Sequence, residues 1–394
     1  MAIHQYNFPT RIQFGAGCLT LLPDALREAG VRRPLIVTDR GLAELSPVLR
    51  TLDFLRQAGL DAATFSEVWG NPVKSQVLAG LAAYRHHGAD SVVGLGGGAA
   101  LDVAKAILLL VNHPGDLFDY EDEKPGALPI DREIPYWVSI PTTAGTGSEV
   151  GRSTVISDDA THVKKIMFSP KLLARRVLLD PELTVGLPAA VTAATGMDAL
   201  THLVEAYLAR GFNPLCDGIA LQGARLVSRS LVHAVDFARR IEQGERALLT
   251  APEHLEARGA MLNAALMGGI AFQKGLGVTH SLAHALSTVC DLHHGLANGI
   301  VIPYAMAYNR DSAEEQMAEL GLAVGARRPG PDGFVTWLEE LKAAIGIPRS
   351  LGEVGVRPEH VERLVGIATS DACHPNNPKS VSEPDFRALF QAAI

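Results

Sequence analysis

The feature that most constrains the fold is a change of pattern near residues 181–187. Before it, short apolar segments with strand character alternate with segments of helical period, and after it one helical segment follows another to the C-terminus. Strands that alternate with helices are typical of βαβ units and a mostly parallel sheet. We therefore predict an N-terminal α/β domain over residues 1–184 and an all-α domain over residues 185–394.

The chain begins with residues 6–14, which alternate apolar and polar side chains and predict a strand or hairpin. A short hairpin leaves an open sheet edge, which pairing with another subunit removes. We therefore expect a homodimer or larger homo-oligomer. The other strands are expected over residues 34–38, 62–68, 91–95, 136–140, 154–157 and 176–179.

Two glycine-containing loops follow predicted strands. Gly96, Gly97 and Gly98 stand between a strand and a helix, where backbone N–H groups and the helix N-terminus can bind a phosphate. The alternative is an ordinary tight turn. A second loop, residues 142–148, is rich in Gly, Thr and Ser. Two such loops at one sheet edge predict a mononucleotide or dinucleotide site.

The acidic residue expected in a dinucleotide site comes before the glycines. The common G-x-G-x-x-G pattern with an acid about 20 residues later is absent. Asp39 instead ends the strand 34–38, where it can accept hydrogen bonds from a ribose 2′-hydroxyl and repel a 2′-phosphate. This predicts NAD rather than NADP; the alternative is an N-cap aspartate without a ligand role.

Histidines cluster in the predicted helical domain. His280 and His284 lie one helical turn apart, and so do Asp198 and His202 upstream. Their neighbours are apolar or small, and buried imidazoles and carboxylates need partners. With His294 as a further point, Asp198, His202 and His280 can enclose one ion, and this donor set suits Fe²⁺ or Zn²⁺. The alternative is a set of core histidines bonded to backbone carbonyls.

Charge and composition exclude several classes of protein. The net charge of −8 over 394 residues, without a basic run, argues against nucleic acid as a partner. The longest apolar run, residues 106–111, is far shorter than the ~20 residues that span a bilayer. Residues 1–10 lack the pattern of a signal peptide. The four cysteines are scattered without a C-x-x-C pair, so we expect a cytoplasmic protein.

Four motifs occur in one order along nearly the whole chain, and together they resemble the iron-dependent (group III) alcohol dehydrogenase family. They are Gly96-Gly-Gly…Asp102, Pro141-Thr-Thr-Ala-Gly-Thr-Gly-Ser-Glu149, Gly196-Met-Asp198-Ala-Leu-Thr-His202…Glu205 and His280-x3-His284-x9-His294-Gly-x2-Asn298. The resemblance implies a Rossmann-like dinucleotide-binding domain, a helical domain and a metal in the cleft between them, the architecture shared with dehydroquinate synthase.

The resemblance also implies roles for individual residues. The metal ligands are expected to be Asp198, His202, His280 and His294, and His284 is expected to act in catalysis beside the nicotinamide. The residues expected to contact the cofactor are Asp39, Asn71, Gly97, Gly98, Ala99, Asp102, Thr142, Thr143, Thr146 and Lys164.

Three positions depart from the family pattern. Ala99 replaces a frequent serine, which removes a hydroxyl but keeps the backbone N–H. His293 stands where many members have proline, so two histidines compete for the last ligand position; the following Gly295 favours His294. Lys274 stands where well-known members carry a small or neutral residue, which leaves the substrate open.

The predicted activity is reversible oxidation of an alcohol to an aldehyde or ketone by NAD(P), with Fe²⁺ (or Zn²⁺) as Lewis acid. The proton is expected to leave through His284. The alternatives are a non-redox, dehydroquinate-synthase-like lyase and a metal-dependent nucleotide-binding sensor. Lys274 and Arg152 are expected to face the cleft and favour a short ω-hydroxy acid or its semialdehyde. If Lys274 instead points to solvent or pairs with a carboxylate, simple alcohols are the expected substrates.

Overall fold

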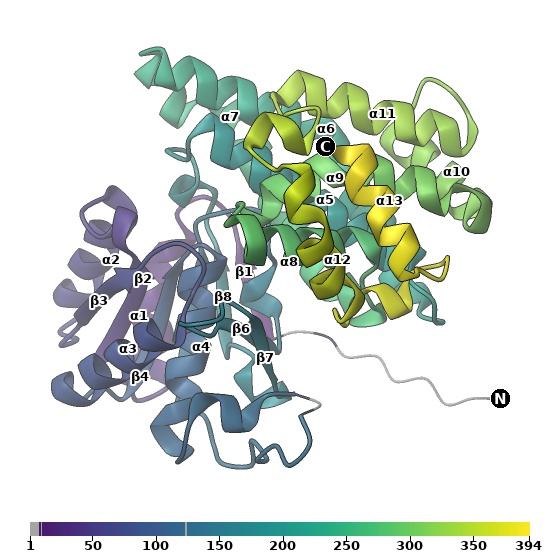
Figure 1. Cartoon of the computed structure of the whole chain (residues 1–394). Coiled ribbons are helices and arrows are strands. Elements are labelled where there is room, and N and C mark those ends of the chain that lie inside the picture. The colour runs from purple at the N-terminus through teal and green to yellow at the C-terminus, as the bar shows by residue number, and fades with distance from the viewer. Residues whose placement is uncertain (1–7, 9, 123) are drawn as a thin grey trace. The chain divides into compact units, whose positions relative to one another are not determined.

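The structure is a computed structural model that describes residue 8 and residues 10–122 and 124–394. Two compact units, each with its own hydrophobic core, make up the chain (Figure 1). We call them the α/β unit and the helical unit. The α/β unit contains residues 8–143 and 148–184, and the helical unit contains residues 144–147 and 185–394.

The α/β unit is built on a parallel sheet, as predicted. Among the described residues, six strands pair in the order β1-β8-β5-β4-β2-β3, and each pairing is parallel. The central strands β2 and β4 are continuous runs of buried residues, as expected of a parallel sheet covered on both faces. The strands are β1 (Arg11–Phe14), β2 (Pro34–Asp39), β3 (Ala63–Val68), β4 (Ser91–Gly96), β5 (Trp137–Pro141) and β8 (Arg176–Leu179).

The predicted N-terminal strand lies only partly in the described region. Residues 6, 7 and 9 of the predicted segment lie outside the described residues. Within the described part, β1 pairs in parallel with β8 and forms one edge of the sheet.

One predicted strand does not belong to the main sheet. β6 (Ser153–Ser157) pairs antiparallel with β7 (Lys164–Phe168), which the sequence analysis did not predict, and together they form a separate two-stranded sheet. β7 begins with two lysines and is largely exposed or half-buried. It therefore lacks the apolar run that identifies a strand in the sequence.

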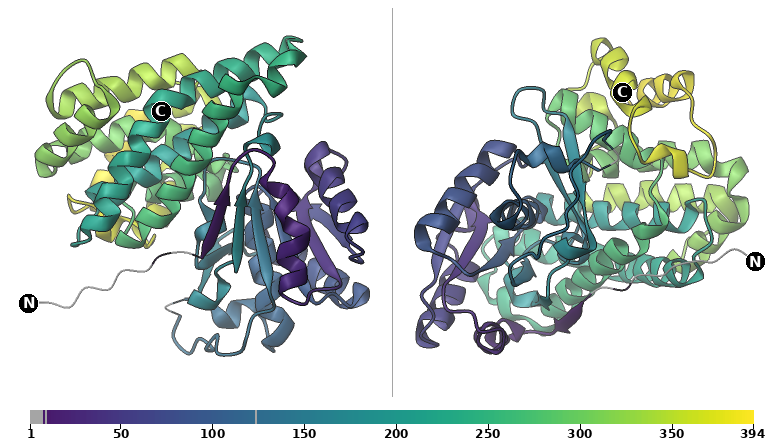
Figure 2. Two further views of the ribbon diagram at one scale, coloured as in Figure 1. Left: turned by 180° about the vertical axis from the view of Figure 1, so that it is seen from behind. Right: turned by 90° about the horizontal axis from the view of Figure 1, so that it is seen from below.

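Helices cover both faces of the main sheet (Figure 2). Apolar residues of α1 and α2, among them Leu22 and Leu55, form one core with Val93 and Ile140 of the sheet. On the other face α4 packs so closely on β4 that a Cβ at Gly94 would lie 3.1 Å from Leu101. The helices of this unit are α1 (Leu22–Glu28), α2 (Ser46–Gln57), α3 (Lys74–His87) and α4 (Gly98–Asn112).

The helical unit confirms the predicted all-α half. Its central helix, α5 (Ala189–Leu208), is buried along nearly its whole length and packs against α6, α7 and α9. Within the described residues, no helix has the length and apolar character needed to cross a membrane. The remaining helices are α6 (Pro214–Glu242), α7 (Pro252–Ala271), α8 (Val278–Cys290), α9 (His294–Asn309), α10 (Glu314–Val324), α11 (Gly330–Ile345), α12 (Val361–Thr369) and α13 (Glu383–Ala393).

Candidate active site

The carboxyl ends of β2 and β4 lie side by side at one edge of the sheet. There the side chain of Asp39, at the end of β2, bonds the glycine turn that follows β4. Oδ2 of Asp39 accepts the backbone N–H of Gly97 at 2.8 Å. A Cβ at Gly96 would lie 2.4 Å from the same carboxylate oxygen, so this position requires glycine. Burial raises the pKa of Asp39 above its usual value, and the N–H of Gly97 opposes that shift.

The second predicted loop follows β5 at the same edge. The backbone N–H of Thr142 donates to the carbonyl of Gly96 at 3.0 Å. A Cβ at Gly97 would lie 3.6 Å from the side chain of Thr143, so the two loops are neighbours. Gly98 and Ala99 begin α4, with Gly97 as its N-cap. The side chain of Thr143 therefore lies beside the N-terminus of α4, an arrangement that suits a phosphate.

Three other predicted cofactor residues lie outside the glycine turn and the strand end just described. Asn71 lies between β3 and α3, and Lys164 begins β7, where it pairs with Ser157. Ser157, the last residue of β6, donates its N–H to the carbonyl of Pro72, so the end of β6 lies next to the segment of Asn71. Thr146 belongs instead to the helical unit.

Asp102 has its carboxylate engaged inside the α/β unit. Its oxygens accept hydrogen bonds from Ser148 Oγ (2.6 Å), Lys105 Nζ (3.3 Å) and the backbone N–H of Val155 (3.1 Å). Lys105 is fully buried and also donates to Ser148 at 2.7 Å. Asp102 thus links α4 to the end of the second loop and to β6.

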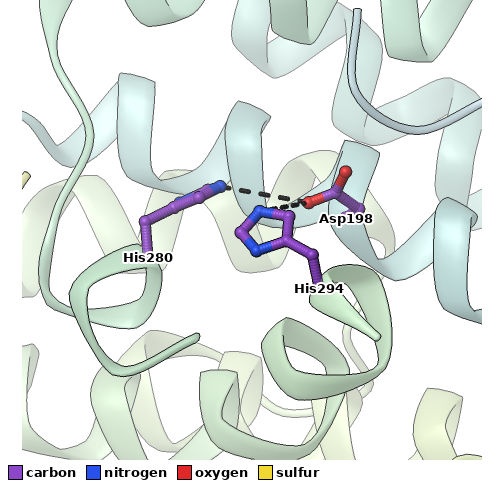
Figure 3. A group of neighbouring side chains, drawn as sticks. All are labelled: Asp198, His280 and His294. Atoms are coloured by element: carbon purple, nitrogen blue, oxygen red, sulfur yellow. Dashed lines mark ion pairs between the residues drawn. The ribbon is translucent and has the colours of Figure 1, made fainter. Parts of the chain in front are cut away.

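Three of the predicted metal ligands converge in the helical unit (Figure 3). Oδ1 of Asp198, on α5, lies 4.0 Å from Nε2 of His280, on α8, and 3.4 Å from Nε2 of His294, the first residue of α9. One ligand atom from each residue lies within 4.8 Å of the other two. Asp198 and His280 are almost completely buried.

His202 lies beside these three residues but is not one of the group. Its ring stacks on that of His280, with 4.6 Å between the ring centroids. Its Nδ1 is buried and has no hydrogen-bond partner among the described residues. Burial, with the neighbouring His280, lowers the pKa of His202 to about 4, so its imidazole is neutral at neutral pH.

These residues fit a divalent metal such as the family resemblance implies. Nε2 of His280 is buried and, within the described part of the chain, has no hydrogen-bond partner, although it faces the carboxylate of Asp198. Leaving such a group unpaired is unfavourable unless something binds it. A carboxylate oxygen with imidazole nitrogens is the donor set of Fe²⁺ or Zn²⁺.

The close approach of α9 to α5 depends on glycine. A Cβ at Gly295 would lie 2.4 Å from the carbonyl oxygen of Ala194. Because Gly295 has none, the first turn of α9 can approach α5 and bring His294 to Asp198. Asn298, one turn later, donates from Nδ2 to Asp198 Oδ1 at 2.8 Å and lies 3.2 Å from His294 Nε2.

The two adjacent histidines at this point have different surroundings. His294 faces Asp198, whereas His293 is exposed and its Nδ1 accepts the backbone N–H of Leu296 as the N-cap of α9. A side chain that caps a helix turns back toward the free N–H groups of the first turn, so the ring of His293 is directed at the end of α9. His294 is therefore the one of the pair that lies within reach of a metal beside Asp198.

His284 is held by an aspartate that the sequence analysis missed. Nδ1 of His284 lies 2.7 Å from Oδ2 of Asp371, whose other oxygen accepts hydrogen bonds from Ser281 Oγ (2.7 Å) and the N–H of Cys373 (2.9 Å). Burial raises the pKa of Asp371, but His284 and the hydrogen bonds outweigh it and hold the pKa well below its usual range. An ionised carboxylate only accepts, so Nδ1 of His284 carries the proton and Nε2 is left available.

Asp371 lies 87 positions after His284 in the chain, in a loop without a recognised motif. The sequence around Asp371 gave no sign of a role in the site. The two side chains come together only because α8 packs against α12, which ends just before Asp371. Asn298 and Glu205 stood in the quoted motifs without an assigned role, and the structure gives each a contact with a predicted ligand.

The expected cationic substrate contact of Lys274 is wrong. Nζ of Lys274 lies 2.5 Å from Oδ1 of Asp217 and donates to the carbonyl of Tyr207 at 2.9 Å, and the side chain is only 6% exposed. Its charge is neutralised within the helical unit, in agreement with the alternative that Lys274 pairs with a carboxylate. Arg152 stacks over the ring of Phe168 in the α/β unit, with 5.3 Å from its guanidinium carbon to the ring centroid.

The chain matches known proteins along nearly its whole length. The family model described as "Iron-containing alcohol dehydrogenase" matches residues 9–181, and the model of the C-terminal part of the Fe-containing alcohol dehydrogenase family matches residues 192–394. The chain is 36% identical to a 4-hydroxybutyrate dehydrogenase of Cupriavidus necator, with 98% of each protein covered. It is 33% identical to an NAD-dependent methanol dehydrogenase of Bacillus methanolicus, with 99% of each covered.

A solved structure has the same fold over its whole length. The crystal structure of a 1,3-propanediol oxidoreductase superposes with a TM-score of 0.91 at 34% identity and covers all of both chains. The matching family models and the full-length relatives agree with the family that the motifs indicate. The chain belongs to the iron-containing alcohol dehydrogenase family and is an NAD-dependent, metal-containing oxidoreductase of that family.

Proposed function

We propose that this protein oxidises short primary alcohols to aldehydes with NAD⁺, and reduces the aldehydes with NADH, at a metal held by Asp198, His202, His280 and His294. The observation that carries the proposal is the buried Nε2 of His280, which faces Asp198 and, among the described residues, has no hydrogen-bond partner. His202 is the fourth ligand in this proposal because the family resemblance implies it and its ring lies beside that of His280.

The bound groups supply the chemistry that the side chains lack. The metal supplies Lewis acidity that lowers the pKa of an alcohol, and the nicotinamide supplies hydride transfer. The protein holds these groups and moves a proton. In this proposal, His284 receives the alcohol's proton at Nε2 and passes it toward solvent, while Asp371 fixes Nδ1–H and the orientation of the ring.

The cofactor contacts are proposed for the residues that the family resemblance implies. In the α/β unit, Asp39 binds the ribose, and the turn at Gly97 and Gly98 binds phosphate with Thr142 and Thr143. Asp102 acts through the position of these loops. The remaining proposed contacts are Asn71, Ala99, Thr146 and Lys164.

The substrate class is proposed from what the named relatives share. Relatives are described as dehydrogenases of 4-hydroxybutyrate, 1,3-propanediol and methanol, each of which carries a primary alcohol. A carboxylate-bearing substrate remains a candidate because the 4-hydroxybutyrate enzyme is 36% identical over 98% of the chain. Lys274 would not bind its carboxylate, because that side chain is paired with Asp217.

The test is turnover with defined metal content. The protein is purified without metal, loaded anaerobically with Fe²⁺ or with Zn²⁺, and assayed for NADH consumption at 340 nm. The substrates are propanal, 3-hydroxypropanal and succinic semialdehyde. Metal-dependent turnover with at least one aldehyde supports the proposal.

Three outcomes would contradict it. Binding of NADH and metal without turnover on any aldehyde would favour the nucleotide-binding sensor. Turnover that persists after a chelator has removed all metal would contradict the metal site. A non-redox lyase would consume substrate without any change at 340 nm; the family membership favours the dehydrogenase over both alternatives.

A further inference from the structure

Glu205 is an almost completely buried acid on α5, two turns from Asp198, with its carboxylate beside the N-terminus of α8. It accepts three backbone N–H groups: from Gly277 at 2.8 Å, from Thr279 at 2.6 Å and from His280 at 3.3 Å. A Cβ at Gly277 would lie 2.9 Å from Oε1 of Glu205, so this approach requires glycine.

The same carboxylate also bonds the side chain of His280. Oε2 of Glu205 lies 2.7 Å from Nδ1 of the imidazole. The backbone groups around the carboxylate are all donors, so both of its oxygens act as acceptors. Nδ1 of His280 must therefore donate, and the lone pair of the neutral ring lies on Nε2, the nitrogen that faces Asp198.

We infer that Glu205 is a positioning residue for the metal site: by accepting Nδ1–H it fixes the tautomer and direction of His280, so that Nε2 points at the ion. The inference rests on the proposed function, because it assumes that His280 binds the metal. Carboxylates that bond a metal-binding histidine in this way typically improve metal affinity about 10- to 100-fold.

The competing explanation is that Glu205 only caps α8. The first turn of a helix leaves its N–H groups without intrahelical partners, and Glu205 satisfies three of them. Asn377 caps the same turn, since its Oδ1 accepts the N–H of Val278 at 3.2 Å, but no hydrogen bond from it to His280 is found among the described residues. Asn377 also bonds Asn309 of α9 and the carbonyl of Lys379, so a variant at this position tests the loss of the cap together with those contacts, none of which is made to His280.

The experiment compares metal affinity and folding in matched variants. Glu205→Gln keeps the size of the side chain but replaces one acceptor oxygen by an NH₂ donor. The amide keeps one acceptor oxygen. If that oxygen stays at Nδ1, the NH₂ group faces the N–H of Thr279; if it turns away, Nδ1 faces a donor and its proton moves to Nε2. In either orientation the site loses an acceptor bond, and the neutral amide polarises the imidazole less than the carboxylate does. Metal-free protein is titrated with Co²⁺ and with Zn²⁺ against a competing chelator, and thermal unfolding of each metal-free variant is followed by circular dichroism.

We expect Glu205→Gln to weaken metal binding by roughly 10- to 100-fold while the metal-free protein still unfolds cooperatively. Asn377→Ala should lower the melting temperature but keep the wild-type metal affinity. Equal metal affinity in Glu205→Gln and wild type, or equal weakening by Glu205→Gln and Asn377→Ala, would overturn the inference.

A second variant covers a failure of Glu205→Gln to fold. Glu205→Asp keeps the charge but withdraws the oxygens by one methylene, so it should also weaken metal binding; wild-type affinity in Glu205→Asp would overturn the inference. Failure of the proposed function is a distinct result. If wild type binds no metal, or if His280→Ala binds it as tightly as wild type, the metal site itself is wrong.

Discussion

The carboxylate of Asp39 and the backbone N–H of Gly97 are joined by a 2.8 Å hydrogen bond between β2 and the turn that begins α4. Asp39 therefore stabilises the glycine turn, in addition to binding the ribose as we propose. A change at Asp39 should thus act on cofactor choice and on the geometry of the phosphate-binding turn together.

The first prediction concerns cofactor choice. We expect wild type to prefer NADH over NADPH, and Asp39→Gly to reduce that preference because the charge that repels a 2′-phosphate is gone. The variant should also lose catalytic efficiency with NADH, by up to about 10-fold, because a part-buried N–H loses its acceptor, at ~1 kcal/mol or more. The ratios of kcat/KM for the two cofactors check both effects.

A matched control lies at the other end of the same sheet. Asp90 accepts the backbone N–H groups of Arg32 and Arg33 at 2.8 and 3.1 Å, before β4 begins. Asp90→Gly should leave the cofactor preference unchanged. Equal efficiency of unmutated protein with NADH and NADPH would show that Asp39 does not select the cofactor.

The second prediction distinguishes the adjacent histidines. His294→Ala removes a proposed ligand and should abolish stoichiometric metal binding and nearly all turnover. His293→Ala removes the cap of α9 and should cost about 1 kcal/mol of stability with metal retained. Metal analysis after dialysis, together with thermal unfolding, measures both, and the opposite ranking would assign the ligand to His293.

The third prediction concerns the pair of His284 and Asp371. Asp371→Asn and His284→Asn should each lower kcat by about 100-fold, the range of a lost proton-transfer group, and the double variant should lose little more. Near-additive losses would mean that the two residues act separately. Metal content serves as the control, because neither variant removes a proposed ligand; a loss of metal in either would contradict the assigned role.

The fourth prediction concerns Glu149, whose carboxyl is almost completely buried after the second loop. Burial raises the pKa of Glu149 from 4.5 to about 7, against the opposing effect of Lys105. The folded state therefore holds its proton more tightly than the unfolded state, so this group's contribution to stability falls as pH rises from about 4.5 to about 7.

Replacing the acid should remove that dependence. Glu149→Gln should be more stable than wild type at pH 8, by up to roughly 3 kcal/mol for a shift of this size, and nearly equal to it at pH 4.5. Lys105 keeps Asp102 as its carboxylate partner in the variant. Urea unfolding at both pH values measures the difference, with the exposed Glu253→Gln as control; an unchanged pH dependence in Glu149→Gln would refute the expectation.

The fifth prediction follows from the corrected place of Lys274. Lys274→Ala leaves Asp217 without its cation, so the variant should lose about 1–3 kcal/mol of stability. Its efficiency should fall by the same factor on succinic semialdehyde and on a neutral aldehyde. A loss confined to the acidic substrate would restore Lys274 as a substrate contact.

Lys171→Ala is the control for this prediction, since it breaks a 2.8 Å pair with the exposed Glu133. Exposed pairs contribute ~0–1 kcal/mol, so this variant should be close to wild type in stability.

The sequence by itself determined the two-part architecture and the identity of the family. The alternation of apolar strands with helices, and its end near residue 181, follow from the different periods of strands and helices, which are local properties of the chain. The positions of Asp198 and His202, and of His280 and His284, were equally local, because a helical turn fixes which residues share a face.

Tertiary structure alone decided which partner each side chain has. The separate β6–β7 sheet, the bond between His284 and Asp371 and the pairing of Lys274 with Asp217 join residues that are distant in the sequence or lack a periodic pattern. His293 and His294 are adjacent and chemically identical, and only the approach of α9 to α5 at Gly295 separates a cap from a metal-facing ring. Contacts of this kind depend on the packing of whole helices, which no local pattern of residue types encodes.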